Sequence, residues 1–264
     1  MKRIFVIFFI FAFAGCSNIF QAPSKKDSDE ALFEDAIKYQ NSGDCTSALA
    51  NFAKMSTNFL ARTEVKSSWI GAYACDCGFR FDTYISSFNS GSTGGSAILL
   101  FLMSAWTQKV VKPASCTTAE TKMNEIGAAA INRTSDQNLF MLFLAMAKIG
   151  VYLRDNADRD STDSLGDGTA DAGFDACSST SISDNAVAEI GSGLGQIIDN
   201  FATITAILSN SSDIYSSLDA LQTACGSNCS TDASAIKADA AKLKVLRTII
   251  NTNTYGIQSG APCP

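Results

Sequence analysis

The chain has 264 residues, of which 20 are basic and 26 acidic, a formal net charge of −6 at neutral pH and no histidine. The basic residues are not clustered along the sequence as the binding of a phosphate backbone would require. We therefore expect no nucleic acid as a partner. The absence of histidine excludes Ser-His-Asp and Cys-His catalysis and every histidine-ligated metal site. Ser-Lys or carboxylate chemistry remains formally open, but no motif points to it, and we expect no enzymatic activity.

Residues 1–15 follow the plan of a signal peptide. Two basic residues are followed by an apolar run over residues 4–14, and Ala14-Gly15 lead into Cys16. The run is shorter than the roughly 20 apolar residues that a membrane-spanning helix needs. We therefore expect a cleaved signal and no permanent span at this end.

The motif Phe13-Ala14-Gly15-Cys16 resembles the lipobox of bacterial lipoproteins, with Phe13 where the family prefers Leu. The resemblance implies cleavage before Cys16 and lipidation of that cysteine with acyl chains such as palmitate. Each buried methylene contributes about 0.8 kcal/mol, so these chains would hold the protein firmly on a membrane. In enteric lipoproteins an Asp directly after the lipidated cysteine is the signal for retention in the inner membrane, and Ser17 stands at that position here. The resemblance therefore favours the periplasmic side of the outer membrane, with the inner membrane or the cell surface as alternatives. Residues 16–29 then form the lipidated cysteine and its tether.

An all-α domain is expected over residues 30–264, as a helical bundle or a repeat-like array of antiparallel helices stapled by disulfides. Its first two amphipathic runs are separated by Asn41-Ser42-Gly43 and predict a helical hairpin. Further helices are expected over residues 79–90, 97–111, 117–132, 135–154, 183–208, 213–223 and 233–250. The second of these is apolar on all sides, which indicates a central core helix, with a lipid-facing or ligand-pocket wall as the alternative.

Residues 30–78 resemble a tetratricopeptide repeat, because small, aromatic and glycine positions fall at the spacing of that family. These positions are Ala36, Tyr39, Gly43, Ala48 and Phe52. A generic helical hairpin is the alternative interpretation.

In a second copy of the pattern, 34 residues further on, Tyr73 corresponds to Tyr39, and Gly78 lies one residue after the position that corresponds to Gly43. It places Asp82 and Ser86 at the Ala and Phe positions, so we expect no regular array beyond about residue 80. The resemblance implies that the second helix of one repeat packs antiparallel to the first helix of the next, which suggests a disulfide between Cys45 and Cys75.

Eight cysteines remain once Cys16 is assigned to lipid, an even number in an oxidising compartment. They are Cys45, Cys75, Cys77, Cys116, Cys177, Cys225, Cys229 and Cys263. Disulfides are the expected state, because the spacings do not match a zinc site. Cys225 and Cys229 are spaced to close a local loop, and Cys263 to staple the C-terminal tail to the core.

An acidic loop is expected over residues 155–182, because seven aspartates between residues 155 and 175 face a single Arg159. A solvated loop and a structural Ca²⁺ site are the two interpretations, the second because Ca²⁺ takes six to eight oxygen ligands. The candidate ligands are Asp163, Asp167, Asp171 and Asp175, with Gly168 at the turn. Leu165 and Phe174 stand where further oxygen ligands belong, so the match is partial.

Two function classes follow from these features. The first is a non-enzymatic scaffold that binds a protein partner in the cell envelope as an accessory to a transport or assembly complex. In its N-terminal hairpin the chain resembles repeat-containing lipoproteins of the barrel-assembly machine and of TRAP-type transporters. The second is a carrier that holds a small hydrophobic ligand in a cavity between the apolar helices around Leu99 and Phe143.

Overall fold

The computed structural model describes residues 26–79, 98–107, 109–160, 165–208, 212–258 and 260–264. This part of the chain is helical and contains no strand, so the predicted all-α class is confirmed. It divides into two compact units, residues 1–65 and 66–264. The signal peptide, Cys16, most of the tether, the helix predicted over residues 79–90 and the candidate ligand Asp163 lie outside the described residues.

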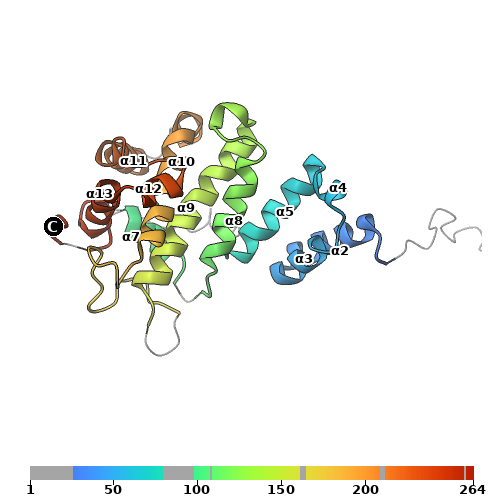
Figure 1. The fold of residues 1–264 in the computed structure, drawn as a ribbon, viewed down its shortest axis with the longest axis horizontal. Coiled ribbons are helices and arrows are strands. Elements are labelled where there is room, and N and C mark those ends of the chain that lie inside the picture. The colour runs from blue at the N-terminus through green and yellow to red at the C-terminus, as the bar shows by residue number, and fades with distance from the viewer. Residues whose placement is uncertain (1–25, 80–97, 108, 161–164, 209–211, 259) are drawn as a thin grey trace, which may run out of the picture. The chain divides into compact units, whose positions relative to one another are not determined.

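The first unit contains the predicted helical hairpin (Figure 1). Its helices are α2 (Asp29–Ser42), α3 (Cys45–Phe52) and α4 (Thr57–Leu60), and α5 (Thr63–Asp76) begins at its end. Ser28 caps α2 by accepting the backbone N–H of Ala31, and Asp44 caps α3 by accepting that of Ser47. Gly43 ends α2 with φ 83°, a left-handed conformation that favours glycine. The turn is therefore built by local capping.

Small and aromatic side chains close the hairpin. Ala36, Ala48 and Phe52 are fully buried, so the two alanines allow a close approach of α2 and α3. The Phe33 ring lies edge-on to Phe52 at a centroid distance of 6.2 Å. Tyr39, by contrast, is 42% exposed. Four of the five positions that carry the repeat resemblance thus form the turn and the core of the hairpin, and the fifth faces solvent.

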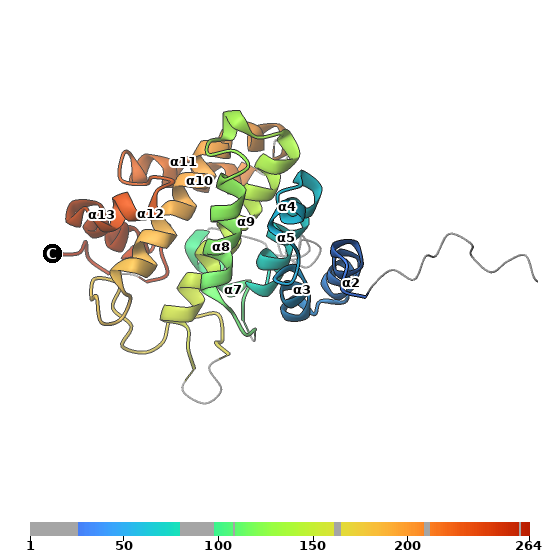
Figure 2. The ribbon, with the colours of Figure 1, turned by 45° about the vertical axis from the view of Figure 1, so that its right-hand side comes forward.

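The second unit is built around the long helix α9. It holds most of α5 together with α7 (Ile98–Ser104), α8 (Pro113–Asn124), the 3₁₀ turn η2 (Ala130–Asn132), α9 (Ser135–Ala157), α10 (Asp184–Leu208), α11 (Ser212–Cys225), α12 (Ala233–Lys237) and α13 (Ala240–Asn251). Helix α9 packs against α7, α8 and α10, and α10 packs in turn against α11, α12 and α13. Figure 2 shows α9 and α10 running side by side through this unit.

Helices α8, α9 and α10 are successively antiparallel. Thr117 of α8 meets Tyr152 of α9, whereas Glu120, one turn later, meets Lys148, one turn earlier. Lys148 also meets Glu189 of α10. The three helices therefore bring polar side chains from three separate chain segments to one place.

Two predicted helices have different boundaries for local reasons. The helix predicted over residues 117–132 is α8, which begins four residues earlier because Pro113 occupies its first turn, where no backbone N–H is needed. It ends before Gly127, whose carbonyl accepts a hydrogen bond from Arg133. The helix predicted over residues 233–250 is divided into α12 and α13, because the Asp239 side chain caps a new helix start.

The apolar segment predicted as a central helix is α7, although it ends at Ser104 instead of reaching residue 111. Leu99, Leu102 and Met103 are at most 1% exposed, which supports the core interpretation. None of the helices in the described part of the chain is both long and apolar enough to cross a membrane.

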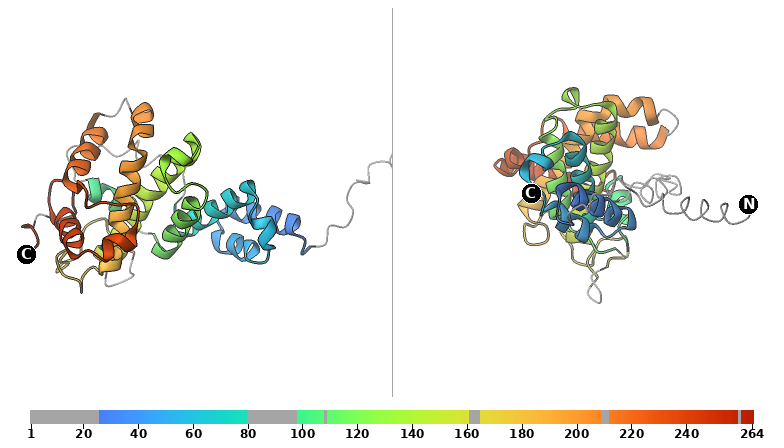
Figure 3. Two further views of the ribbon diagram at one scale, coloured as in Figure 1. Left: turned by 45° about the horizontal axis from the view of Figure 1, so that its top comes forward. Right: turned by 90° about the vertical axis from the view of Figure 1, so that its right-hand side faces the viewer.

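Disulfides staple the second unit at three places. They join Cys77 to Cys116, Cys177 to Cys263 and Cys225 to Cys229. The last two agree with the expected local loop and the expected tail staple. Figure 3 shows the C-terminus beside the dark red helix α13. Cys45 and Cys75 are also disulfide-bonded. The pairing expected between those two stays a prediction.

Helix α10 carries glycines at its closest contacts. A Cβ atom on Gly193 would lie 2.7 Å from the Ile149 side chain of α9, and one on Gly195 would lie 2.4 Å from the backbone carbon of Ser230. The second contact fixes the segment that leads into α12 against α10. Glycine costs about 1 kcal/mol in a helix relative to alanine, so its presence here reflects packing.

We expect Gly195→Ala to lower the melting temperature, because overpacking costs about 1–3 kcal/mol and backbone atoms of Ser230 cannot rotate away. That cost equals or exceeds the helix-propensity gain of about 1 kcal/mol. Gly191→Ala is the matched control on the same helix, since a Cβ there would meet only the terminal methyl groups of Leu246 and Ile236, which can shift. Thermal unfolding followed by circular dichroism measures both. An equal or higher melting temperature for Gly195→Ala would contradict this packing.

Candidate functional site

A polar pocket of about 450 Å³ opens between α8, α9, α10 and the start of α12. Helix α8 lines it with Thr117, Glu120, Thr121 and Asn124, which share one face because they are three or four residues apart. Ala128 lines the pocket from the loop after α8. One wall of the pocket is thus a single polar helix face.

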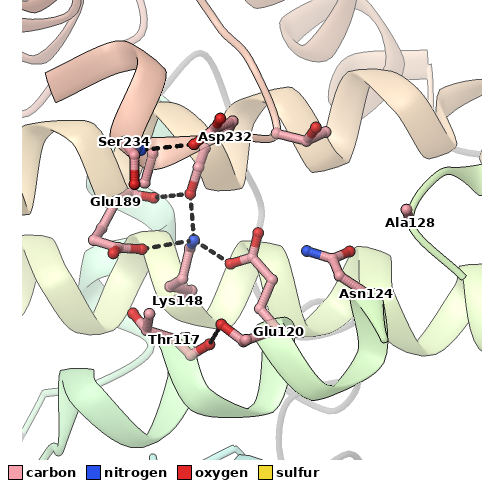
Figure 4. Close-up of a pocket in the computed structure, with 12 residues that line it drawn as sticks. Thr117, Glu120, Asn124, Ala128, Lys148, Glu189, Asp232 and Ser234 are labelled. Atoms are coloured by element: carbon pink, nitrogen blue, oxygen red, sulfur yellow. Dashed lines mark hydrogen bonds and ion pairs between the residues drawn. The ribbon is translucent and has the colours of Figure 1, made fainter. Parts of the chain in front are cut away.

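Lys148 forms the floor of the pocket (Figure 4). Its side chain is 1% exposed, and its ammonium group pairs with the carboxylates of Glu120 and Glu189, the latter at 3.1 Å. The ammonium also donates a hydrogen bond to the Ser192 hydroxyl oxygen at 2.5 Å. A buried ammonium is tolerated only when it is paired and hydrogen-bonded. The three N–H groups of Lys148 therefore each have an acceptor.

The opposite wall is the segment that leads into α12. Asp232 caps this helix through one carboxylate oxygen, which accepts the backbone N–H groups of Ser234 and Ala235 at 2.8 and 3.2 Å. Asp232 and Ser234 are exposed, whereas Thr231 is partly buried. This wall supplies a third carboxylate and further hydroxyl groups.

Arg133 braces the end of the pocket near Asn124. Its guanidinium donates to the Gly127 carbonyl at 2.7 Å and to the Asn124 side-chain oxygen at 3.1 Å. Burial lowers the pKa of Arg133, while the charges of Asp199 and Glu120 act in the opposite direction. Asn124 also accepts from Gln196 of α10, so the α8 wall is fixed to α10 from this side.

The arrangement favours ion pairing over nucleophilic catalysis. A Ser-Lys pair needs a lysine whose amine is free to accept the serine proton, but the Lys148 side chain is engaged by two carboxylates. The Ser192 hydroxyl donates its own hydrogen to the backbone carbonyl of Glu189 at 3.1 Å. Neither group is therefore poised to activate the other.

In the acidic loop, aspartate carboxylates accept hydrogen bonds from nearby backbone N–H groups. The buried Asp158 carboxylate accepts from Asp167 at 2.8 Å and from Gly168 at 3.0 Å. Burial raises the pKa of Asp158, and these two hydrogen bonds oppose the rise. Asp167 accepts the N–H and the hydroxyl of Thr169, which lowers the pKa of Asp167.

The other candidate calcium ligands also turn to nearby backbone. Asp171 accepts the N–H of Arg159, and Asp175 accepts that of Cys177, both at 2.9 Å. Within the described residues no three acidic or cysteine side chains group as a metal site would need. Because Asp163 lies outside those residues, the calcium interpretation stays a prediction.

The pocket residues were not singled out from the sequence. The one signal was Lys148 itself, a single charge within the apolar run from Met141 to Leu153. Its partners Glu120 and Glu189 are remote in sequence, and no motif links them to it. The pairing depends on the antiparallel register of three helices, which the periodicity of one sequence does not determine.

No protein-family model, curated protein or solved structure matches the chain.

We expect Tyr152, which shares a hydrogen bond of 2.9 Å with Thr117, to ionise later than an ordinary tyrosine. Burial raises the pKa of Tyr152 to about 12. The folded protein then keeps a proton that the unfolded chain loses near pH 10, so this contribution to stability is complete below pH 10 and declines as the pH rises towards 12. Phenolate absorbance of the folded protein, with melting temperatures between pH 9 and 11, measures both effects.

Tyr152→Phe is the control, because it keeps the ring and removes the hydroxyl. This variant should lose the late ionisation step and this part of the pH dependence. Ionisation of Tyr152 near pH 10 in the wild-type protein would show that the hydroxyl is not buried beside α8.

Proposed function

We propose that this chain is a lipid-anchored lipoprotein of the bacterial cell envelope that acts as a non-enzymatic scaffold for a partner protein. The observation that carries the proposal is the number of residues in the sequence between the starts of two helices. Helices α2 and α5 are both 14 residues long and begin at Asp29 and Thr63. That offset is the tetratricopeptide period of about 34 residues, and such repeats present binding surfaces built from stacked helix pairs.

The packing of the hairpin adds support. Ala36, Ala48 and Phe52 are buried where the repeat pattern needs small or aromatic residues, and Gly43 provides the left-handed turn. Tyr39 leaves 42% of its surface exposed on α2. Exposed tyrosines are frequent energetic anchors of protein interfaces, so we assign the partner-binding surface to the α2 side of the hairpin around Tyr39.

The non-enzymatic part of the proposal is supported by the polar pocket. Its lysine is held as a charged group between two carboxylates, and its serine is hydrogen-bonded to a helix carbonyl. The chain has no histidine that could replace the lysine as a base.

The membrane part rests on the lipobox-like motif at Cys16, with the periplasmic side of the outer membrane as the proposed location. The disulfides of the second unit are consistent with an exported protein, because such bonds persist in oxidising compartments.

The test is photocrosslinking in the native envelope, with a photoreactive amino acid at position 39 of the full-length chain. We expect one discrete protein adduct from position 39 in the membrane fraction. Position 131 is the matched control, because Ile131 is 91% exposed on η2 in the second unit. The adduct should be absent from position 131, and Tyr39→Ala should reduce co-purification of the same protein about tenfold or more.

Cys16→Ser supplies the second arm of this experiment. Without the thiol there is no acyl anchor, so the variant should be released from the membrane or retained unprocessed. A mature, membrane-bound Cys16→Ser form would contradict the anchor, and identical adducts from positions 39 and 131 would contradict the assigned surface.

The alternative function is a carrier of a small hydrophobic ligand. The helices expected to enclose its cavity are packed, with Leu99 fully buried and Phe143 7% exposed in the core. A separate, more apolar pocket of about 320 Å³ lies between α11, α13 and the C-terminal tail, where Val245, Ile249 and Tyr255 line it. Native mass spectrometry of the purified chain would favour the carrier if it found a retained apolar molecule.

A further inference from the structure

The polar pocket has a lining that excludes an apolar ligand. The residues around it offer hydroxyl, amide, carboxylate and ammonium groups, and the only wholly apolar side chains among them are the methyl groups of Ala128 and Ala233. No aromatic ring lines it, so a ligand that binds by stacking finds no platform. At about 450 Å³ the pocket lies within the range of small-molecule sites. The lining therefore selects for a small, polar and flexible molecule.

The charge of the pocket selects the sign of the ligand. Glu120, Glu189 and Asp232 contribute three carboxylates against the single ammonium of Lys148. The N–H groups of that ammonium are engaged by two carboxylates and by Ser192. The Arg133 guanidinium at the end of the pocket also donates to protein acceptors, so an anion would find both cations already engaged. A cation, by contrast, would reduce the excess of negative charge. The pocket is therefore complementary to a ligand with two positive charges.

The carboxylates also have room to accept further hydrogen bonds. In Figure 4 Glu120 and Glu189 each direct one oxygen to Lys148, and no interaction is drawn from their second oxygens. The Asp232 side chain caps α12 through one oxygen only. An ammonium donates up to three hydrogen bonds, whereas a divalent metal ion would have to displace Lys148 from Glu120 and Glu189.

We propose that this pocket binds a small aliphatic diamine, with its two ammonium groups paired to carboxylates of two different helices, Glu189 of α10 and Asp232 at the start of α12. Lys148 is a positioning residue, because it holds Glu120 and Glu189 in place and leaves one oxygen of each for the ligand. The hydroxyl groups of Thr121 and Thr231 accept remaining N–H groups. Binding at this site is independent of the scaffold surface proposed on α2.

The test is isothermal titration calorimetry of the purified full-length chain in detergent with 1,4-diaminobutane. Three molecules of similar length act as controls, namely 1-aminobutane, butane-1,4-diol and succinate. We expect the diamine to bind at least tenfold more tightly than the monoamine, with no measurable binding of the diol or the dianion. The affinity should fall as NaCl is added, because salt screens partly exposed ion pairs.

Asp232→Asn tests the mouth of the pocket with little risk to folding, because asparagine caps a helix about as well as aspartate. Glu189→Gln tests the α10 wall, and each variant should weaken diamine binding about tenfold or more. Glu34→Gln removes an equal charge from a side chain that is 71% exposed in the first unit, and it should leave binding unchanged. Melting curves identify any variant that fails to fold.

The proposal is overturned if the wild-type chain does not bind 1,4-diaminobutane, or if it binds succinate or the diol equally well. It is also overturned if Asp232→Asn binds like wild type, or if Glu34→Gln weakens binding as much as the pocket variants do. Binding of Ca²⁺ or Mg²⁺ that excludes the diamine would identify the site as a metal site instead.

Discussion

The ion pairs of Lys148 with Glu120 and Glu189 determine how α8, α9 and α10 can pack. Each of the three residues belongs to a different helix, and each side chain is at most 12% exposed. Removing one partner from such a buried pair costs about 3–5 kcal/mol, because the remaining charge is left without compensation. A shift of one helix along another would have the same effect, so the ion pairs fix the register of this three-helix layer.

The glycines of α10 complement that constraint. Gly195 lets the segment before α12 approach the helix backbone, and this approach brings Asp232 to the wall opposite Glu120. The pocket therefore results from two requirements together, charge compensation on its floor and close backbone packing at its mouth. The N-terminal hairpin follows a simpler rule, since alanines and a turn glycine at regular spacing define it locally.

Features that depend on local chemistry could be predicted from the sequence, whereas long-range pairs could not. The hairpin, the all-α class, the central helix and the Cys225–Cys229 loop all follow from spacing within short segments. Remote segments are joined by the Cys77–Cys116 bond and by the Lys148 ion pairs. No pattern within a short segment predicts either of them. The periodicity over residues 233–250 was also misleading, because it continued across the Asp239 cap.

The central claim is that Lys148 is a charged ammonium enclosed by two carboxylates. The most direct measurement is NMR spectroscopy of the side-chain N–H groups in protein labelled with ¹⁵N-lysine, near neutral pH. The account predicts one ammonium signal that exchanges slowly with water and that is lost or exchanges rapidly in Glu120→Gln. A neutral amine, or the absence of any protected lysine signal in the wild-type chain, would contradict it.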